Sequence, residues 1–264
     1  MLWPTLDPHY ALAGFLVGTL VGLTGVGGGS LMTPILILLF GISPAKAVGT
    51  DLLFAAATKT VGSLVHSLNH TIDWRIVRRL ACGSVPSAAL ALFILWSMHM
   101  TTGGAHYVIT AVLTGALFLT ATVLIVRDRI FALYEKQLGR LDDRSVALLT
   151  IAMGATLGLL VTFSSVGAGA LGVTALLLLY PRASAAQIVG SDIAHAVPLT
   201  LIAGIGHGAM GSVNWHTLCS LLAGSIPGIF VGSFVAPRLP DLHLRYALAS
   251  VLLIVAGRMA FSLI

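Results

Sequence analysis

Long apolar segments recur along the whole chain, and they decide which solvent the protein folds in. The run "YVITAVLTGALFLTATVLIV" carries no charge and has the length of about 20 residues that a helix needs to cross a bilayer. Comparable runs include "LACGSVPSAALALFILW" and "YALASVLLIVAGRMAFSLI". Only 9% of the 264 residues are charged, whereas a soluble domain has about a quarter. The sequence therefore predicts an all-α, polytopic membrane protein.

The distribution of charge argues against a nucleic-acid partner. The formal net charge is +5, but most basic residues lie in two short segments between apolar runs, where the positive-inside bias of membrane proteins expects them. The N-terminal stretch "MLWPTLDPHY" lacks the basic start and the small-residue cleavage site of a signal peptide. We therefore expect a multi-pass protein of the plasma (inner) membrane whose surroundings are the lipid bilayer and not nucleic acid.

Catalytic and metal-binding patterns are missing from the sequence. There is no H-E-x-x-H and no G-x-S-x-G motif, and Glu135 is the only glutamate. Cys82 and Cys219 both lie in apolar segments, where we interpret them as small buried hydrophobic side chains. We expect no enzyme activity, no metal site and no cofactor.

The chain contains an internal repeat. "GFLVGTLVGLTGVGGGSLMTPILILLFG" from Gly14 aligns with "GATLGLLVTFSSVGAGALGVTALLLLYP" from Gly154, and farther on "TIDWRIVRRLACGSVP" aligns with "SVNWHTLCSLLAGSIP". Each half then holds a glycine-broken segment followed by three plain helices. We divide the chain into a first repeat (1–126), a cytoplasmic inter-repeat loop (127–147) and a second repeat (148–264). The predicted plain spans are 45–68, 75–97, 105–126, 185–206, 215–236 and 244–263, and the broken segments are 10–40 and 148–180.

The basic residues indicate how the two halves are oriented. If each broken segment is a re-entrant hairpin, a half has three crossings and the repeats are inverted. One side of the membrane then collects the arginines at 75, 78 and 79, those of the 127–144 region, and Arg182, Arg238 and Arg245. If each broken segment crosses once, the repeats are parallel and the last three arginines move to the other side. The positive-inside bias favours the inverted arrangement.

The glycine clusters predict a break in each of these segments, formed by a re-entrant or split helix. Non-helical backbone at membrane depth is tolerated where protein or a water-lined cavity covers it, and freed N–H groups at a helix start favour an anion. Ser30 would cap the second half-helix. The alternative, close helix packing through small residues, suffices for Gly14, Gly18, Gly22, Gly154 and Gly158. The predicted substrate-binding residues at the breaks are Thr24, Gly27, Gly28, Gly29, Ser30, Ser164, Ser165, Gly167 and Gly169.

A few ionisable residues fall inside predicted spans, where charge is costly and indicates function. Asp51 and Asp192 occupy matched positions, and they either cap helix N-termini or couple and gate proton movement. His66 and His207 are also matched, and either relay protons or form interfacial hydrogen bonds. Lys59 lies deep in its span, and we expect it in the substrate site.

The quoted motifs resemble those of one known family, the sulfite exporter TauE/SafE permeases. The run from "GFLVGTLVGL" through "AVGTDLLFAAATKTVGSLVH" to "IDWR" is similar to the opening repeat of that family, and "GHGAMGSVNW" to its second-half counterpart. The resemblance implies a carrier of small anions such as sulfite or organosulfonates, proton-linked in some members. Two departures are that aspartates stand at 51 and 192, where small polar residues are usual, and that the second break is poorer in glycine.

Together these observations predict a secondary transporter whose partners are a small anionic substrate and, as coupling ion, the proton. An anion or metabolite channel and a membrane scaffold for a sulfur-metabolism partner are the alternatives. The sequence leaves the substrate, the direction of transport and homo-oligomer formation open.

Overall fold

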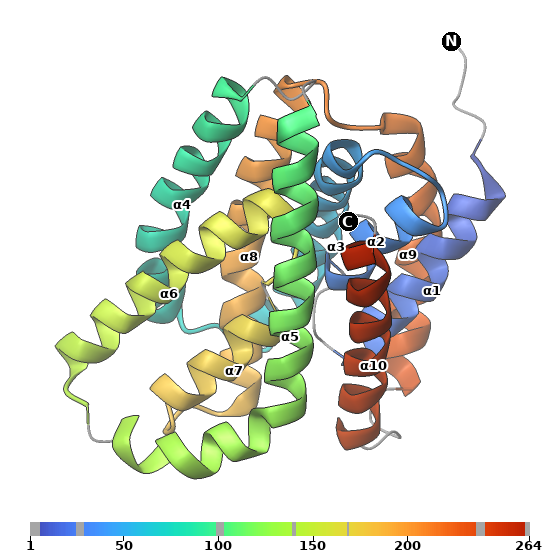
Figure 1. Cartoon of the computed structure of the whole chain (residues 1–264). Helices are drawn as coiled ribbons and strands as arrows, with labels where there is room; N and C mark the ends of the chain where they lie inside the picture. Colours follow the sequence, from blue (N-terminus) through green and yellow to red (C-terminus); the bar gives the residue numbers. More distant parts are fainter. Residues whose placement is uncertain are drawn as a thin grey trace.

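The computed structural model describes residues 6–24, 29–98, 103–138, 141–167, 169–235 and 241–261, and within these ranges the regular structure is helical. Figure 1 shows the helices gathered in one bundle. The first half contains α1 (Pro8–Thr24), α2 (Gly29–Leu38), α3 (Pro44–Leu68), α4 (Trp74–Ser97) and α5 (Gly103–Leu138). The second half contains α6 (Asp143–Ser164), α7 (Ala170–Leu179), α8 (Ala185–Ala209), α9 (Trp215–Val235) and α10 (Asp241–Phe261).

The helix pattern confirms a polytopic membrane protein. Five segments of the described chain are long and apolar enough to cross a bilayer: Trp74–Ser97, His106–Tyr134, Asp143–Ser164, Ala185–Ala209 and Trp215–Gly232. Helices α3 and α8 are both 25 residues long. Helix α3, which carries Asp51 and Lys59, is not among the five. Its polar residues are therefore the ones that need an explanation.

Each glycine-broken segment turns back on itself. In the first segment, the rings of Tyr10 in α1 and Phe40, just after α2, lie 4.5 Å apart, so the end of the segment returns to its beginning. In α6 and α7, the hydroxyls of Thr150 and Tyr180 are 2.9 Å apart. The repeat alignment pairs Tyr10 with Thr150 and Phe40 with Tyr180. Both segments are hairpins, and the same two positions close each of them.

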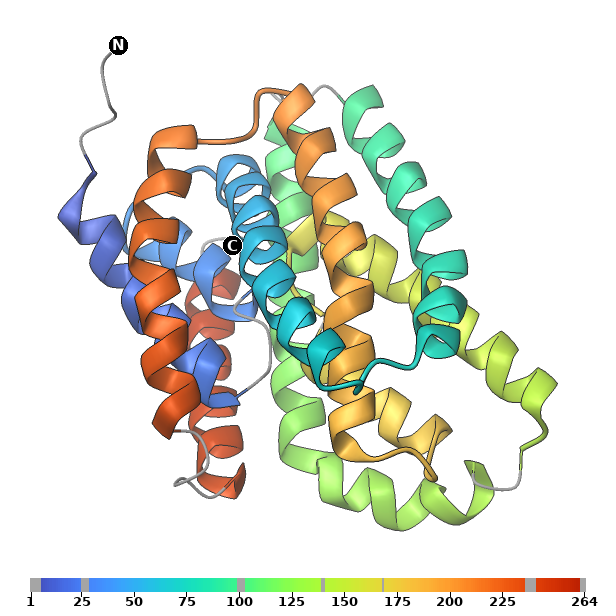
Figure 2. The same cartoon turned by 180° about the vertical axis from the view of Figure 1, so that it is seen from behind.

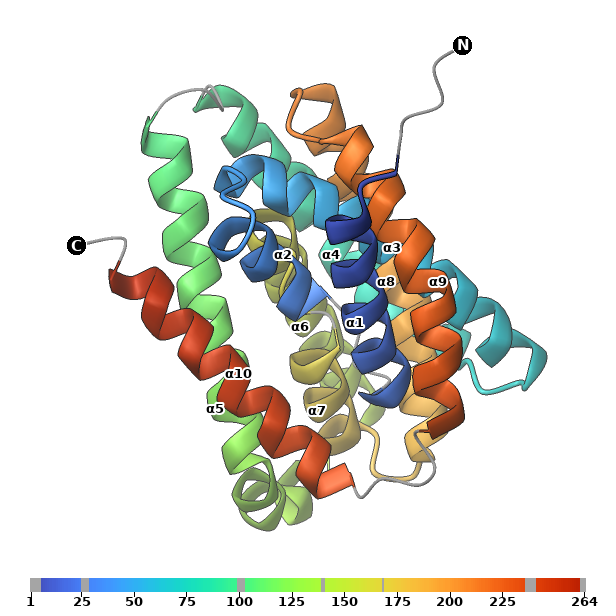
Figure 3. The same ribbon diagram turned by 90° about the vertical axis from the view of Figure 1, so that its right-hand side faces the viewer.

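The two halves pack against each other through helices of opposite halves. Helix α1 contacts α9 and α6 contacts α4, while α3 contacts α8 and α5 contacts α10. Exchanging the two halves leaves this set of pairs unchanged. Helices α3 and α8 run antiparallel, because Gly49 lies at Ser212 whereas Gly190, early in α8, lies at Thr71 beyond the end of α3. Figures 1 and 3 show α5 and α10 running in opposite senses as well.

Glycines allow a close approach of α1 to α9 and of α4 to α6. A Cβ atom on Gly14 or Gly18 would overlap the backbone of α9, and one on Gly154 or Gly158 would overlap the backbone of α4. The packing interpretation of these four glycines is confirmed. Figure 2 shows α1 lying along α9 over the length of the hairpin arm.

Two expectations differ from the structure. The predicted loop at 127–147 is mostly helical, because α5 continues to Leu138 and α6 begins at Asp143; Figure 1 shows the last part of α5 bending away from its axis at the lower edge of the bundle. Cys82 and Cys219 are exposed on the helix surface and not buried. On α4 the adjacent Gly83, and not Cys82, faces α6, and on α9 the neighbours Leu218 and Ser220, and not Cys219, are buried.

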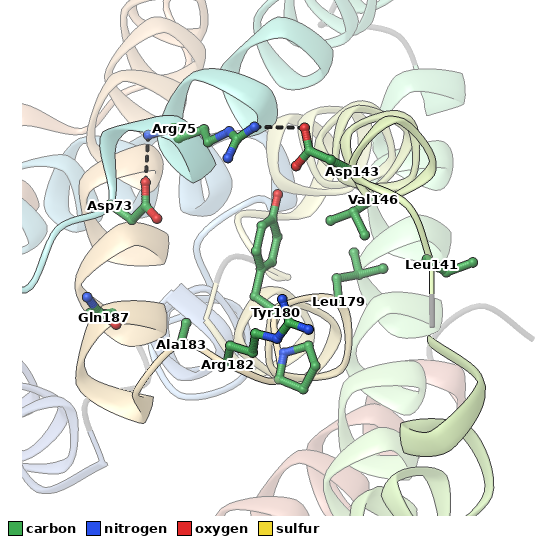
Figure 4. A pocket seen from close by; sticks show the side chains of 11 residues that line it. Asp73, Arg75, Leu141, Asp143, Val146, Leu179, Tyr180, Arg182, Ala183 and Gln187 are labelled. Carbon is green, nitrogen blue, oxygen red and sulfur yellow. Dashed lines mark hydrogen bonds and ion pairs between the residues drawn. The ribbon is translucent and has the colours of Figure 1, made fainter. Parts of the chain in front are cut away.

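Charged residues from both halves meet at one end of the bundle. Arg75 and Arg79 of α4 bind the carboxylate of Asp143 at 2.7 and 2.8 Å. Arg75 and Asp143 line a surface pocket, and Figure 4 shows that Arg182 lines it too, below Tyr180. Just before α6, Asp142 accepts hydrogen bonds from the Ser145 hydroxyl and the Arg144 N–H, and these hold its pKa below the usual value. Arg75, Arg79 and Arg182 thus lie at the same end of the bundle.

Replacing Gly83 by alanine is expected to destabilise the protein, because the new Cβ would overlap the Ile151 carbonyl and lie 2.6 Å from the Ala155 nitrogen. Overpacking of this kind costs about 1–3 kcal/mol. Gly257→Ala is the matched control, since nothing lies within 4 Å of its Cβ. Thermal unfolding in detergent should show a lower midpoint for Gly83→Ala alone, and equal midpoints would contradict the close packing of α4 on α6.

Cysteine labelling tests the placement of the basic end. In a parent with Cys82 and Cys219 replaced by alanine, single cysteines are introduced at Leu141, Arg182 or Ser97. We expect a membrane-impermeant maleimide to label the Ser97 variant in intact cells and the other two only after permeabilisation, because basic loops stay in the cytoplasm. Opposite accessibility of the Leu141 and Arg182 variants would exclude the inverted arrangement.

Candidate functional site

The break of the second hairpin is an irregular turn inside the protein. Helix α6 ends at Ser164 and α7 begins at Ala170, and between them Ser165, Gly167 and Gly169 adopt φ values of 59°, 122° and 127°. The Ser164 hydroxyl accepts a hydrogen bond of 3.2 Å from the Val166 N–H. Because these residues are buried, surrounding protein covers the broken backbone, as membrane depth demands.

His207 completes the hydrogen bonding of this break. Its Nε2 lies 3.0 Å from the carbonyl oxygen of Thr162, which the end of α6 leaves without a helical partner. His66, its repeat mate, instead pairs its Nδ1 with the Thr71 hydroxyl at 2.8 Å. Each histidine also lies against a glycine at the start of the opposite span, His207 at Gly49 and His66 at Gly190. These contacts favour the interfacial interpretation, and a gating role for either histidine stays a prediction.

Asp51 joins three segments of the chain. Its side chain is fully buried, and one carboxylate oxygen accepts hydrogen bonds from the N–H and hydroxyl of Thr33, at 3.1 and 2.5 Å. The Ser165 hydroxyl of the second break lies beside the same carboxyl group. The other carboxylate oxygen has no hydrogen-bond partner among the described residues. Asp51 thus connects α3 to α2 of the first hairpin and to the break of the second.

Neither aspartate caps a helix. The N-cap residues are Ser43 for α3 and Ser184 for α8, and Ser184 forms a capping box with Gln187. Asp51 and Asp192 lie inside their helices, about two turns from the start, so the capping alternative is wrong. A buried carboxyl group inside a membrane helix is retained for another reason.

Lys59, Asp192 and His195 form the other side of the cluster. Lys59 is only 6% exposed and interacts electrostatically with both aspartates, more strongly with Asp192, and with His195. Asp192 packs against Gly172 of α7, where a Cβ would overlap its carboxylate oxygen. One carboxylate oxygen of Asp192 also lacks a hydrogen-bond partner within the described chain.

The fold therefore brings together Asp51, Lys59, Asp192 and Ser165, which are far apart in the sequence. Ser30 lies within the first turn of α2 and not before it, so the prediction that it caps this helix is wrong. Thr24 ends α1 and Gly29 opens α2, whereas Gly27 and Gly28 are outside the described residues.

Sequence reasoning missed three residues of this cluster: Thr33, Gly172 and Ser84. Ser84, on α4, lies 2.8 Å from His195. For Ser84 a signal existed, because it aligns with Ser225 in the repeat. For Thr33 none did, because its repeat mate is Val173.

Chemically, the cluster offers one ammonium group, two carboxyl groups, hydroxyls and an irregular turn of backbone in a low-dielectric interior. Buried charges are stable when they are paired or hydrogen-bonded. If both carboxyl groups are ionised, one lysine does not balance them, so the cluster favours uptake of a cation such as a proton.

Comparison with known proteins places the chain among membrane transporters. The family described as Sulfite exporter TauE/SafE matches residues 10–259. The Bacillus subtilis protein named probable membrane transporter protein YjnA is 42% identical over 92% of this chain and 95% of its own length. The B. subtilis protein YdhB, of the same description, is 29% identical over 89% and 92%, and a Xylella fastidiosa protein is 27% identical over 86% and 83%. No solved structure matches significantly.

Gly167→Ala is expected to strain the second break, because its φ of 122° disfavours any residue with a Cβ. A misplaced φ of this kind costs about 1–3 kcal/mol. The expected strain does not come from steric overlap, since the atom nearest to a Cβ at this position is 3.6 Å away. The control is Gly208→Ala, in a helix with nothing nearer than 3.7 Å. Thermal unfolding should separate the two, and equal stability would show that the turn relaxes without its glycine.

Proposed function

The chain belongs to the TauE/SafE sulfite exporter family, and from this premise we propose that it is a secondary transporter of a small anion of the sulfite or organosulfonate class. The observation that supports this most is the buried cluster of Asp51, Lys59 and Asp192 at the second break. A cation and irregular backbone at the interface of two repeats are the usual elements of a transporter site.

We propose that the two halves are inverted repeats that move against each other around this cluster. The antiparallel course of the matched helices α3 and α8 supports this, since parallel repeats would align them. So does the position of Arg182 beside Arg75. Rocking of one half would expose the cluster to either side of the plasma membrane in turn.

Binding would divide between the breaks and Lys59. Ser165, Gly167 and Gly169, with the matched stretch Thr24 to Ser30, would supply N–H and hydroxyl donors. Lys59 would supply the positive charge. An oxyanion accepts such donors well because it has several oxygens and no protons to satisfy.

Charge balance suggests how a proton would be coupled. Lys59 is the counter-charge that Asp192 has within the cluster. When an anion binds Lys59, Asp192 loses part of that counter-charge, and a buried carboxylate without a partner is unstable. Asp192 would then take up a proton, so that one monovalent anion travels with one proton. Asp51, held by Thr33, would gate this step.

Flux in proteoliposomes tests the proposal. We expect saturable uptake of sulfite or a sulfonate that an imposed pH gradient accelerates. Gly28→Leu should abolish the flux by blocking the first break. Asp51→Asn and Asp192→Asn should keep exchange but lose the response to the gradient. Asp142→Asn, outside the spans, is the control carboxylate.

The alternatives give different results in the same assay. Flux that does not saturate and ignores the gradient would indicate a channel. No flux of any sulfur oxyanion by folded protein would contradict the proposed substrate class and favour a scaffold.

A further inference from the structure

A histidine that breaks the symmetry of the repeat lies beside the proposed anion site. His195 is on α8, one turn after Asp192, and none of its surface is exposed. Its Nε2 is 2.8 Å from the hydroxyl of Ser84 on α4, which is also fully buried. A long-range bond between two helices therefore fixes the ring.

The other ring nitrogen of His195 is unsatisfied. Its Nδ1 is buried and has no hydrogen-bond partner among the residues that the structure describes. The ring is near enough to Lys59 for the two to interact electrostatically. Buried polar atoms without partners are rare in native proteins, and each one needs a reason.

Packing alone does not require a histidine at this position. The repeat mate of His195 is Phe54, which is equally buried. The mate of Ser84 is Ser225, whose hydroxyl bonds its own helix at the Leu222 carbonyl. The same fold thus accepts an apolar ring in the first half, and the polar pair is specific to the second.

The mate of Lys59 breaks the symmetry in the same way. It is Thr200, whose hydroxyl bonds the Ala196 carbonyl of its own helix. Lys59 and His195, two residues that depart from the repeat, thus lie near each other. A bound anion that touches both would explain why they do.

We propose that His195, positioned by Ser84, is a substrate-recognition residue that donates its Nδ1–H to an oxygen of the anion held by Lys59. In this arrangement the Ser84 hydroxyl donates to Nε2, which sets the tautomer with the proton on Nδ1. A sulfite or sulfonate group has three oxygens, so it can accept from Lys59 and His195 at once. The inference rests on the proposed transport of such anions.

The test compares four variants in reconstituted flux and in ligand-induced thermal stabilisation by sulfite and sulfoacetate. His195→Phe copies the first half and should fold, but loses the donor. We expect its KM to rise about 10-fold or more, as loss of a hydrogen bond to a charged group does, with maximal flux retained. His195→Gln keeps a donor and should recover most of the affinity. Ser84→Ala should fall between the two.

Thr120→Val is the matched control, because that buried hydroxyl bonds only the Ala116 carbonyl of its own helix. A parental KM and parental stabilisation in His195→Phe would overturn the inference and leave the proposed function standing. Equal loss in His195→Phe and His195→Gln would also overturn it, because it would mean that the ring shape and not the donor matters. If the parent neither binds nor moves any sulfur oxyanion, both proposals fail together.

Discussion

The interrupted backbone at membrane depth is the constraint on which the rest of this structure depends. Without water, each freed N–H and C=O group must find a partner inside the protein. In the second hairpin, the Ser164 hydroxyl, His207 and the surrounding helices supply that cover. Helix α8 reaches the break through His207, and α3 reaches it through Asp51 beside Ser165. The same cover surrounds the buried polar cluster of Asp51, Lys59 and Asp192.

Glycine-mediated contacts between the halves hold the helices around this cluster together. The first arm of each hairpin lies against a plain helix from the other half, α1 on α9 and α6 on α4, with backbones close enough that a methyl group would not fit. Neither half can bury its hairpin alone.

A symmetric frame surrounds an asymmetric interior. Asp51 and Asp192 are matched, but Thr33 bonds only Asp51 and is replaced by valine in the second half. Lys59 and His195 lie nearer to Asp192 and have the non-ionisable mates Thr200 and Phe54. The frame gives two similar half-sites, and these three differences assign them different chemistry: an acid held by hydrogen-bond donors on one side, and an acid facing a cation on the other.

The sequence by itself determined the solvent, the repeat and the order of helices, because hydrophobicity, glycine spacing and repeat offset are local or linear properties. It also identified Asp51, Lys59 and Asp192, since a charge inside an apolar run is visible without a structure. Only the tertiary structure decided which of these groups meet. Thr33 and Ser84 look like ordinary small polar residues of a helix, and their partners are fixed by which faces of α2, α3, α4 and α8 turn inward. The exposure of Cys82 and the helical extension of α5 to Leu138 were decided in the same way, because packing and not composition sets which face is buried and where a helix ends.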